Sequence, residues 1–540
     1  FFLGPTVDEV FWRTQIRDSF SWVAGKHTVK FGGEWMHSDN AQVFRGFFEG
    51  RSIFDSVPGF LRYASPAAAG GFGPTTGECL DAAGALKGWV TWGAPFNETC
   101  PAGSSVGGPL ILYLQGAGLQ GPATDAAGFS DIANEDYSLF VQDKWQINSR
   151  FTFNYGLRWE AQIMPDPVVP PAKTAYGAFL NNPLFPSDGT LPSPKKEFQP
   201  RVGFAWDVAG NGKSVVRANW GIYYGHQNML SQVGSITTNG VQQQTIFTNS
   251  SLASLGFTPT PNAYPGLINP TPVAPGTFPS GTGVRVFDRN YNNPRIYTTS
   301  VGFEQELAPD WAVYMDFTHS KGVYLTHFYN ANNGFYDSRT GNFVPANTFA
   351  PQLGEVMVTS ALGKSLYQGF TIGVRKRMSK RFQLEGNYVY SRDRDNDSNE
   401  RDPFTDRRIN PMRPDLDYGY SDRDEPHKFN FFTYADLPWG ITANVRMQAH
   451  SAQPTTPLGA TQRNTARKDN QYFSFDWRAS RPIKFGDRYQ LVPTVEMFNT
   501  FNNKNNVNPL ASPALFNFDG FLRQGVGDPR QAQLSVKFLF

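Results

Sequence analysis

Side chains that could carry out catalysis occur in this sequence, but they do not form a recognisable catalytic pattern. The seven His residues are scattered along the chain, without an HExxH pair that could hold zinc on a helix. His226, His319, His327 and His450 fall near the ends of predicted strands, where such side chains most often contact water. We therefore expect a protein that is not an enzyme, with no catalytic residue, no bound cofactor and no metal.

One acidic run faintly resembles a calcium-binding loop. Residues 393–400 read Asp-Arg-Asp-Asn-Asp-Ser-Asn-Glu, without the Gly that forms the sharp turn and without a correctly placed final Glu. Residues 392–425 combine eleven acidic residues with seven Arg. This mixture favours a solvated loop held by its own ion pairs.

The only two cysteines, Cys79 and Cys100, are 21 residues apart and have no CxxC spacing. A zinc site is therefore a poor interpretation. A single structural disulfide is the simplest one, and it would contribute about 3 kcal/mol of stability in a chain exposed to an oxidising compartment. The alternative is a pair of inert thiols.

Alternation of apolar and polar residues is the strongest structural pattern, and it recurs along the whole chain. In residues 151–160 the odd positions are Phe, Phe, Tyr, Leu and Trp, and the even positions are Thr, Asn, Gly, Arg and Glu. Residues 440–450 and 473–479 repeat this pattern, which predicts strands with one apolar side. The polar side of such strands would face the lumen of a barrel. The charged residues expected to line it are Arg158, Glu160, Arg217, Arg446, Asp476 and Arg478.

The connections between these strands alternate between short and long. Short hairpin turns rich in Gly, Asn, Asp and Pro are predicted at 23–26, 147–150, 209–213, 307–310, 378–381, 437–440 and 485–488. Long polar connections are predicted at 162–197, 226–293, 328–363, 392–426, 451–469 and 501–528. This asymmetry is typical of outer-membrane barrels, which have short periplasmic turns and long extracellular loops.

The composition agrees with a barrel in a membrane. Aromatic residues make up 15% of the 540 residues, and only 17% are charged. The net charge of +2 gives no field that would attract a polyanion, so nucleic acid is not an expected partner. Because only every second residue of a barrel strand contacts lipid, the chain needs no long apolar run.

Seventeen strands are expected: 12–23, 26–37, 42–50, 109–118, 135–147, 150–161, 198–208, 213–225, 294–306, 311–326, 365–377, 381–391, 427–437, 440–450, 470–484, 487–499 and 529–540. Complete bacterial barrels have an even number of strands, so we expect strands to be missing at the N-terminal side. With the C-terminus in the periplasm, this count places residues 51–108 on the periplasmic side, which is unusual for a long connection. The segment then either is an unusual periplasmic insertion or contains a further hairpin.

The last strand ends on Phe540, with Phe538 on the same apolar face. A final amphipathic strand that ends in Phe resembles the signal by which the barrel-assembly machinery recognises outer-membrane barrels. We therefore expect Phe538 and Phe540 to act as an insertion signal.

Six segments, taken together, resemble the TonB-dependent outer-membrane receptors, and within them the Oar-like branch. They are KHTVKFGGE at 26–34, SLFVQDKWQINSRFTFNYGLRWE at 138–160, PRVGFAWDVAGNGKSVVRANWGIYY at 200–224, YQGFTIGVRKRMSKRFQLEGNYVYS at 367–391, DEPHKFNFFTYADLPWG at 424–440 and EMFNTFNN at 496–503. The resemblance implies a 22-stranded barrel in the outer membrane of a Gram-negative bacterium, an N-terminal plug inside the barrel, and energy supplied through TonB.

From this resemblance we expect residues 1–540 to form a single incomplete outer-membrane β-barrel domain, without its plug and first strands. The expected function is active import of a large or scarce solute, such as a glycan fragment, a peptide or a metal chelate. The expected partners are outer-membrane lipid, the plug and, through it, TonB. A passive channel and a surface adhesin or assembly protein anchored by the barrel are the alternatives.

Overall fold

The computed structural model describes most of the chain from Val7 to Phe540. The residues outside this description are 1–6, 46, 55, 70–72, 74–75, 83–84, 92–99, 107, 119–120, 122, 228, 249, 251–261, 270–281, 333–334, 338–341, 345–349, 351, 399–413, 458–461, 508–524 and 527.

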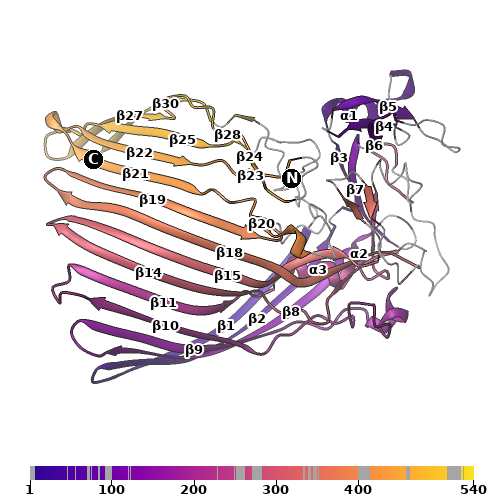
Figure 1. Ribbon diagram of the computed structural model, residues 1–540, viewed down its shortest axis with the longest axis horizontal. Coiled ribbons are helices and arrows are strands. Elements are labelled where there is room, and N and C mark those ends of the chain that lie inside the picture. Colours follow the sequence, from indigo (N-terminus) through magenta and orange to yellow (C-terminus); the bar gives the residue numbers. More distant parts are fainter. Residues whose placement is uncertain are drawn as a thin grey trace.

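One 18-stranded sheet dominates the molecule (Figure 1). Fifteen of its strands are long, and each pairs antiparallel with the next long strand in chain order. They are β1 (Val7–Ala24), β2 (His27–Phe44), β8 (Phe129–Gln146), β9 (Phe151–Ile163), β10 (Glu197–Asp207), β11 (Ser214–Tyr224), β14 (Arg295–Ala308), β15 (Trp311–Asn330), β18 (Leu353–Ser379), β19 (Phe382–Asp395), β21 (His427–Asp436), β22 (Thr442–His450), β25 (Tyr472–Ser480), β27 (Tyr489–Phe498) and β30 (Gln531–Leu539). A tilted strand of about 9–11 residues crosses the hydrocarbon core of a membrane, so each strand is long enough to do so.

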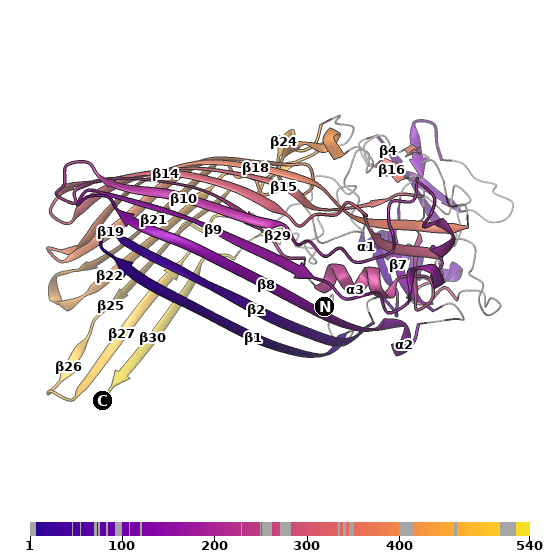
Figure 2. The same ribbon diagram turned by 90° about the horizontal axis from the view of Figure 1, so that it is seen from below.

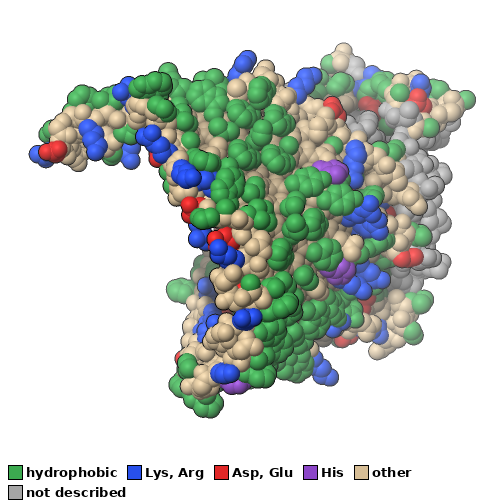
Figure 3. Space-filling model, turned by 60° about the vertical axis from the view of Figure 1, so that its left-hand side comes forward, with side chains coloured by type: hydrophobic (Ala, Val, Ile, Leu, Met, Phe, Trp, Pro, Cys, Tyr) green, Lys and Arg blue, Asp and Glu red, His purple; other side chains and the backbone are tan. Residues whose placement is uncertain are grey.

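The two faces of this sheet differ in chemistry because residues paired across strands point to the same side. Leu139, Trp159 and Phe198 form one such row on β8, β9 and β10, and the side chains of Leu139 and Phe198 are more than half exposed. The neighbouring row on the opposite face contains Ser138 and Glu160. Figure 3 shows hydrophobic side chains gathered over the strands. A soluble monomer rarely exposes so large an apolar surface, whereas lipid solvates it.

The two ends of the sheet also differ, as the sequence predicts. All seven predicted hairpin turns lie at one end, which we call the turn end: six join neighbouring long strands, and the turn at 485–488 joins the short β26 (Ile483–Phe485) to β27. At the first two turns, the Nζ of Lys26 donates a hydrogen bond to the carbonyl of Ile147, and the Oδ1 of Asn148 accepts from the backbone N–H groups of Arg150 and Phe151. The long connections all lie at the other end, which we call the loop end.

At the loop end, the connections fold into cores of their own. The helix α3 (Met229–Thr237) packs against β8 and against β13 (Thr282–Phe287), which joins the large sheet parallel to β18. Val233 and Ile236 of this helix are buried with Ile132, Phe287 and Tyr291. This packing holds the connection after β11 against the polar face of the sheet.

Two of the expected barrel strands, 42–50 and 109–118, are wrong. β2 ends at Phe44 and pairs directly with β8. Residues 109–118 contain β7 (Leu110–Ala117), which belongs to a separate three-stranded sheet with β3 (Arg51–Phe54) and β12 (Gln244–Thr248). Leu112, Tyr113 and Leu114 are all buried, so both faces of β7 pack against protein and its apolar residues do not contact lipid.

This correction also moves residues 51–108 to the loop end. Without the two extra strands, the connection between β2 and β8 lies at the same end as the other long connections, so the periplasmic placement is wrong. The segment contains α1 (Val57–Ala64), η1 (Ala67–Ala69) and a second three-stranded sheet of β4 (Thr76–Asp81), β5 (Leu86–Thr91) and β6 (Ser104–Val106).

The predicted disulfide is present in this segment. Cys79 of β4 is bonded to Cys100, and the Cys79 side chain is fully buried beside Val90. The bond therefore joins a strand of the small sheet to the connection that follows β5.

The remaining elements are short. They are α2 (Asp125–Gly128), η3 (Pro171–Lys173), η4 (Gly177–Phe179), η5 (Pro414–Asp417), η6 (Pro438–Gly440), β16 (Phe335–Asp337), β17 (Asn342–Val344), β20 (Gly419–Tyr420), β23 (Pro454–Thr455), β24 (Ala466–Arg467), β26 (Ile483–Phe485), β28 (Asn506–Val507) and β29 (Gly525–Val526). Among the described residues, no helix combines the length and the apolar character that crossing a membrane requires.

The large sheet is curved like a trough (Figure 2). Its outermost strands are β1 and β30, and within the described part of the chain no hydrogen-bonded pairing joins these two strands. Side chains on both faces of β1 and β30 are exposed. The polar face lines the inside of the trough, and we call it the lumen face.

Candidate functional site

The six predicted lumen residues occupy the lumen face in two groups. Arg158, Glu160 and Arg217 lie on β9 and β11. The other three lie on β22 and β25, where Arg446 is paired in register with Asp476 and Asn444 with Arg478. Within each strand the register places these charged residues on the same face of the sheet as their polar neighbours.

Most of these charges have a partner on a neighbouring position. The Nε of Arg158 lies 2.5 Å from Oε1 of Glu160, and Arg217 lies 3.2 Å from Glu304. These pairs are partly or largely exposed, and exposed pairs contribute only about 0–1 kcal/mol each. We conclude that they keep the lumen face polar and add little to its stability.

Around Glu160, four titratable residues from four segments converge near the loop end. We call Asp136, Glu160, Glu197 and His226 the wall cluster. Asp136 belongs to β8, Glu197 begins β10 directly opposite Glu160 of β9, and His226 follows β11 by two residues. Nδ1 of His226 lies 3.2 Å from Oδ1 of Asp136, and its Nε2 lies 3.6 Å from Oε2 of Glu160. Gln199 also donates a hydrogen bond to Glu160.

The charges of the wall cluster are unevenly satisfied. Contacts with the carboxylates of Asp136 and Glu160 raise the pKa of His226 to about 10. Glu197 is 2% exposed, and neither of its carboxylate oxygens meets a hydrogen-bond partner of normal geometry among the described residues. The sequence pointed to Glu160 and His226 separately, but gave no signal that Asp136 and Glu197 would join them.

The second group contributes to a cavity of about 550 Å³ between the ends of β22, β25, β27 and β30. We call it the Tyr472 pocket. The rings of His450 and Tyr472 stack there with their centroids 5.0 Å apart, and Glu425 lies 3.5 Å from His450. Arg446 and Asp476 line the same cavity together with several Asn and Gln side chains. An aromatic face beside amides and carboxylates is suited to a hydroxyl-rich solute.

A further cavity of about 550 Å³ along β8 to β11 is lined mostly by uncharged residues, but its charged residues are six basic ones and a single acidic one, Asp143. Its cationic side chains are those of Arg17, Lys30, Lys144, Arg158, Arg201 and Arg217. Arg201 also lies over the ring of Tyr223, 4.5 Å from its centroid. This part of the lumen face would attract anionic groups.

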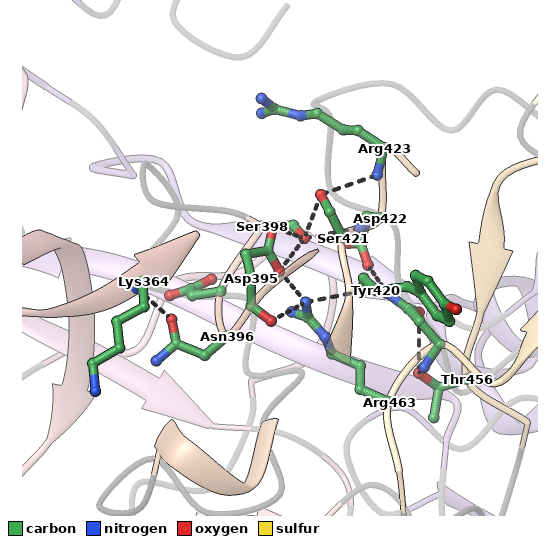
Figure 4. A network of polar contacts seen from close by, with 12 residues as sticks. Lys364, Asp395, Asn396, Ser398, Tyr420, Ser421, Asp422, Arg423, Thr456 and Arg463 are labelled. Atoms are coloured by element: carbon green, nitrogen blue, oxygen red, sulfur yellow. Dashed lines mark hydrogen bonds and ion pairs between the residues drawn. The ribbon is translucent and has the colours of Figure 1, made fainter. Parts of the chain in front are cut away.

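Above the lumen, a polar network joins two loop-end connections (Figure 4). The guanidinium of Arg463 contacts the carboxylate of Asp395 and donates a hydrogen bond to the carbonyl of Tyr420. Asn464 donates to the same carbonyl at 2.7 Å and to Asp422 at 2.8 Å. The side chains of Asp395 and Arg463 are each only 9% exposed. This network fixes the connection after β22 to the end of β19.

The network also bears on the acidic run 393–400. The Asp395 carboxylate accepts from Ser398 as well as from Arg463, and Asp424 lies 2.7 Å from Arg467. Ion pairs do hold this region, as expected, but the Arg partners come from a different connection. Residues 399–413 lie outside the described residues.

The four His residues considered for catalysis have separate surroundings. His327 is fully buried and lies 3.3 Å from Asp397, and His319 lies 3.4 Å from Gln368. His226 belongs to the wall cluster and His450 to the Tyr472 pocket. His226 and His450, whose side chains are partly exposed, both contact carboxylates.

Comparison with solved structures identifies the fold. The outer-membrane transporter YddB from Escherichia coli superposes with a TM-score of 0.52 at 12% identity, over 99% of this chain and 54% of that one. The FrpB iron transporter from Neisseria meningitidis gives a TM-score of 0.49 at 11% identity, over 98% of this chain and 55% of that one. This chain therefore spans about half the length of the solved chains it matches. No curated protein sequence matches it.

A family model agrees with this fold. The model described as an outer membrane beta barrel domain matches residues 9–448, which begin within β1 and end within β22. Since the match covers most of the chain, the sheet with its lipid-facing and lumen faces is an outer-membrane barrel wall, and the localisation is the outer membrane of a Gram-negative bacterium. The chain belongs to the outer membrane β-barrel domain family.

Proposed function

We propose that this chain is the barrel portion of a TonB-dependent transporter of the Oar-like branch. Its resemblance to these receptors in six segments supports this function, as does the fold it shares with an outer-membrane transporter. In this proposal the loop end captures a solute outside the cell, and a plug inside the barrel gates its passage with energy delivered through TonB.

The Tyr472 pocket is the observation that carries the solute-binding part of the proposal. It lies on the lumen face at the loop end, where an incoming solute first meets the barrel wall. The stacked rings of His450 and Tyr472 offer an apolar platform, and the surrounding amides and carboxylates offer hydrogen bonds. Of the three solute classes considered, a glycan fragment fits this pocket best, because a sugar ring has both an apolar face and a rim of hydroxyls.

Liposome swelling tests the proposal against a passive channel of the same architecture. The full-length protein, including any segment that precedes this chain, is reconstituted into liposomes, which are then diluted into arabinose or raffinose. A gated transporter without an energy source keeps these sugars out, so we expect no swelling above that of empty liposomes. Rapid swelling with both sugars would support the passive channel and contradict the proposal.

Deletion of residues 226–293 tests the adhesin alternative. This connection forms much of the loop end without contributing a long barrel strand. Under the proposal, cells that express the shortened protein lose solute uptake and keep their adhesion to surfaces. Loss of adhesion with unchanged uptake would favour the adhesin.

A further inference from the structure

Three residues of the wall cluster are close enough to share one metal ion. The possible ligand atoms of Glu160, Glu197 and His226 all lie within 4.8 Å of one another. They come from β9, from the first residue of β10 and from the segment after β11. A bound ion would therefore link two barrel strands to the long connection at 225–294.

The spacing within the wall cluster suits metal ligands better than a direct hydrogen bond. Nε2 of His226 and Oε2 of Glu160 are 3.6 Å apart, which is longer than a normal hydrogen bond. Two ligands bound at about 2.1 Å in a tetrahedral site are separated by about 3.4 Å. The separation of His226 and Glu160 therefore already matches two ligands of one ion, and Glu197 lies within 4.8 Å of both.

Glu197 supplies an independent observation, because its buried carboxylate lacks a well-placed donor or cation among the described residues. Its side chain is almost fully buried, and although the side chain of Asn293 lies beside it, neither carboxylate oxygen has a hydrogen-bond partner of normal geometry in the described part of the chain. A buried carboxylate without a donor or a cation is costly.

The balance of charge points the same way. Asp136, Glu160 and Glu197 are three carboxylates, and the permanent cation in contact with them is Arg158, which pairs with Glu160. These carboxylates therefore outnumber the Arg that pairs with them, and a cation held between them would reduce this excess of negative charge.

Asp136 positions the imidazole for this role. Its Oδ1 lies 3.2 Å from Nδ1 of His226, and although the two atoms do not form a hydrogen bond of normal geometry, the carboxylate charge favours a proton on Nδ1. A bound metal ion would displace the proton from Nε2, which lies on the side of Glu160. Metal-binding His residues commonly have a carboxylate on the second ring nitrogen, which fixes the tautomer and the ring orientation.

We propose that Glu160, Glu197 and His226 form a binding site for one divalent transition-metal cation, with Zn²⁺ as the best fit. One imidazole and two carboxylates are ligands that zinc accepts, and water completes the fourth position. The His226 side chain is 34% exposed, which gives an ion access from the lumen side. The site fastens the connection at 225–294 to the barrel wall, and it does not depend on the proposed transport function.

Calorimetric titration of the folded full-length protein with ZnCl₂, after removal of metals by EDTA and dialysis, tests this site. We expect one saturable site on the wild-type protein. Glu197→Gln and His226→Gln should each abolish it, and Asp136→Asn should weaken it about 10- to 100-fold, the usual effect of removing a partner of a ligating His. Glu425→Gln is the matched control, because it removes a different carboxylate 3.5 Å from a His, and it should leave zinc binding unchanged.

The Glu197→Gln protein is expected to fold, since an amide needs no counterion, and the heat-modifiable mobility of the barrel on gels checks this. Cobalt(II) supplies a second readout, because its visible absorption in a four-coordinate site is intense and should disappear in the same two variants. Zinc binding that is absent in the wild type, or that persists unchanged in both folded variants, would overturn the proposal.

Discussion

Placing Arg on one or the other of two adjacent residues of β18 distinguishes a lipid-facing surface from a water-facing one. Ile372 is 40% exposed on the apolar face, in the row with Met315 and Tyr388. Thr371 points to the lumen face and is paired in register with Asp316. Both lie near the middle of the membrane-spanning part of the strand, so Ile372→Arg and Thr371→Arg differ mainly in the solvent that receives the charge.

The expected magnitudes differ clearly. An Arg facing lipid near the bilayer midplane costs about 2–4 kcal/mol, which corresponds to a decrease of about 30- to several hundred-fold in the folding equilibrium constant. An Arg on a water-facing surface changes stability by about 0.5 kcal/mol or less, and Asp316 offers it a partner. We therefore expect a difference of at least about 1.5 kcal/mol between the two variants.

Equilibrium unfolding in phospholipid vesicles measures this difference. The full-length protein and both variants are refolded into vesicles and titrated with guanidinium chloride, with tryptophan fluorescence as the signal. Ile372→Leu serves as a control for the change of side-chain shape. If both Arg variants lost the same stability, or if Thr371→Arg lost more, the assignment of the two faces of the sheet would be refuted.

Three other predictions concern separate parts of the chain. Replacing both Cys79 and Cys100 with Ala should destabilise the small loop-end sheets by about 3 kcal/mol, because the disulfide closes a loop of this length. Limited proteolysis should then cut residues 51–117 while the barrel stays heat-modifiable, and an unchanged cleavage rate would contradict this prediction. Arg463→Ala leaves Asp395 buried without its cation, so hydrogen exchange at 419–424 should show a loss of about 3–5 kcal/mol in the local stability of the polar network. The double variant with Asp395→Ala should recover part of this lost stability, and equal exchange in the single and double variants would argue against the ion pair. Deletion of Phe540 should reduce barrel assembly in cells and leave refolding in vitro unchanged, because it removes the predicted insertion signal without removing a buried side chain. An equal decrease of assembly in cells and of refolding in vitro would indicate a structural role instead.

The barrel wall could be predicted from the sequence because its information is local. A strand between lipid and water needs only period-2 alternation, and a hairpin needs only a few turn residues, so the face of Arg158 and the turn at 147–150 follow from the chain itself. The same rule failed at 109–118. Alternating Leu residues occur there too, but protein rather than lipid covers them, and neighbouring residues such as Tyr113 and Gln115 are buried as well.

The contacts of the candidate site could not be predicted, because they join distant segments. Glu160 and Glu197 face each other only because β9 pairs with β10 across a connection of more than thirty residues. His226 reaches them from the segment after β11, and Arg463 reaches Asp395 from another connection. Charge alone indicated that these residues are polar surface, and long-range pairing decided which of them meet.

Energy-dependent uptake tests the central claim most directly. Cells with and without the full-length protein are grown in a medium rich in glycan fragments, peptides and metal chelates, and the medium is compared by mass spectrometry in the presence and absence of a protonophore. We predict that at least one solute is depleted only when the protein is present and the inner membrane is energised. Depletion that requires the protein but continues at the same rate with the protonophore would contradict active, TonB-dependent import.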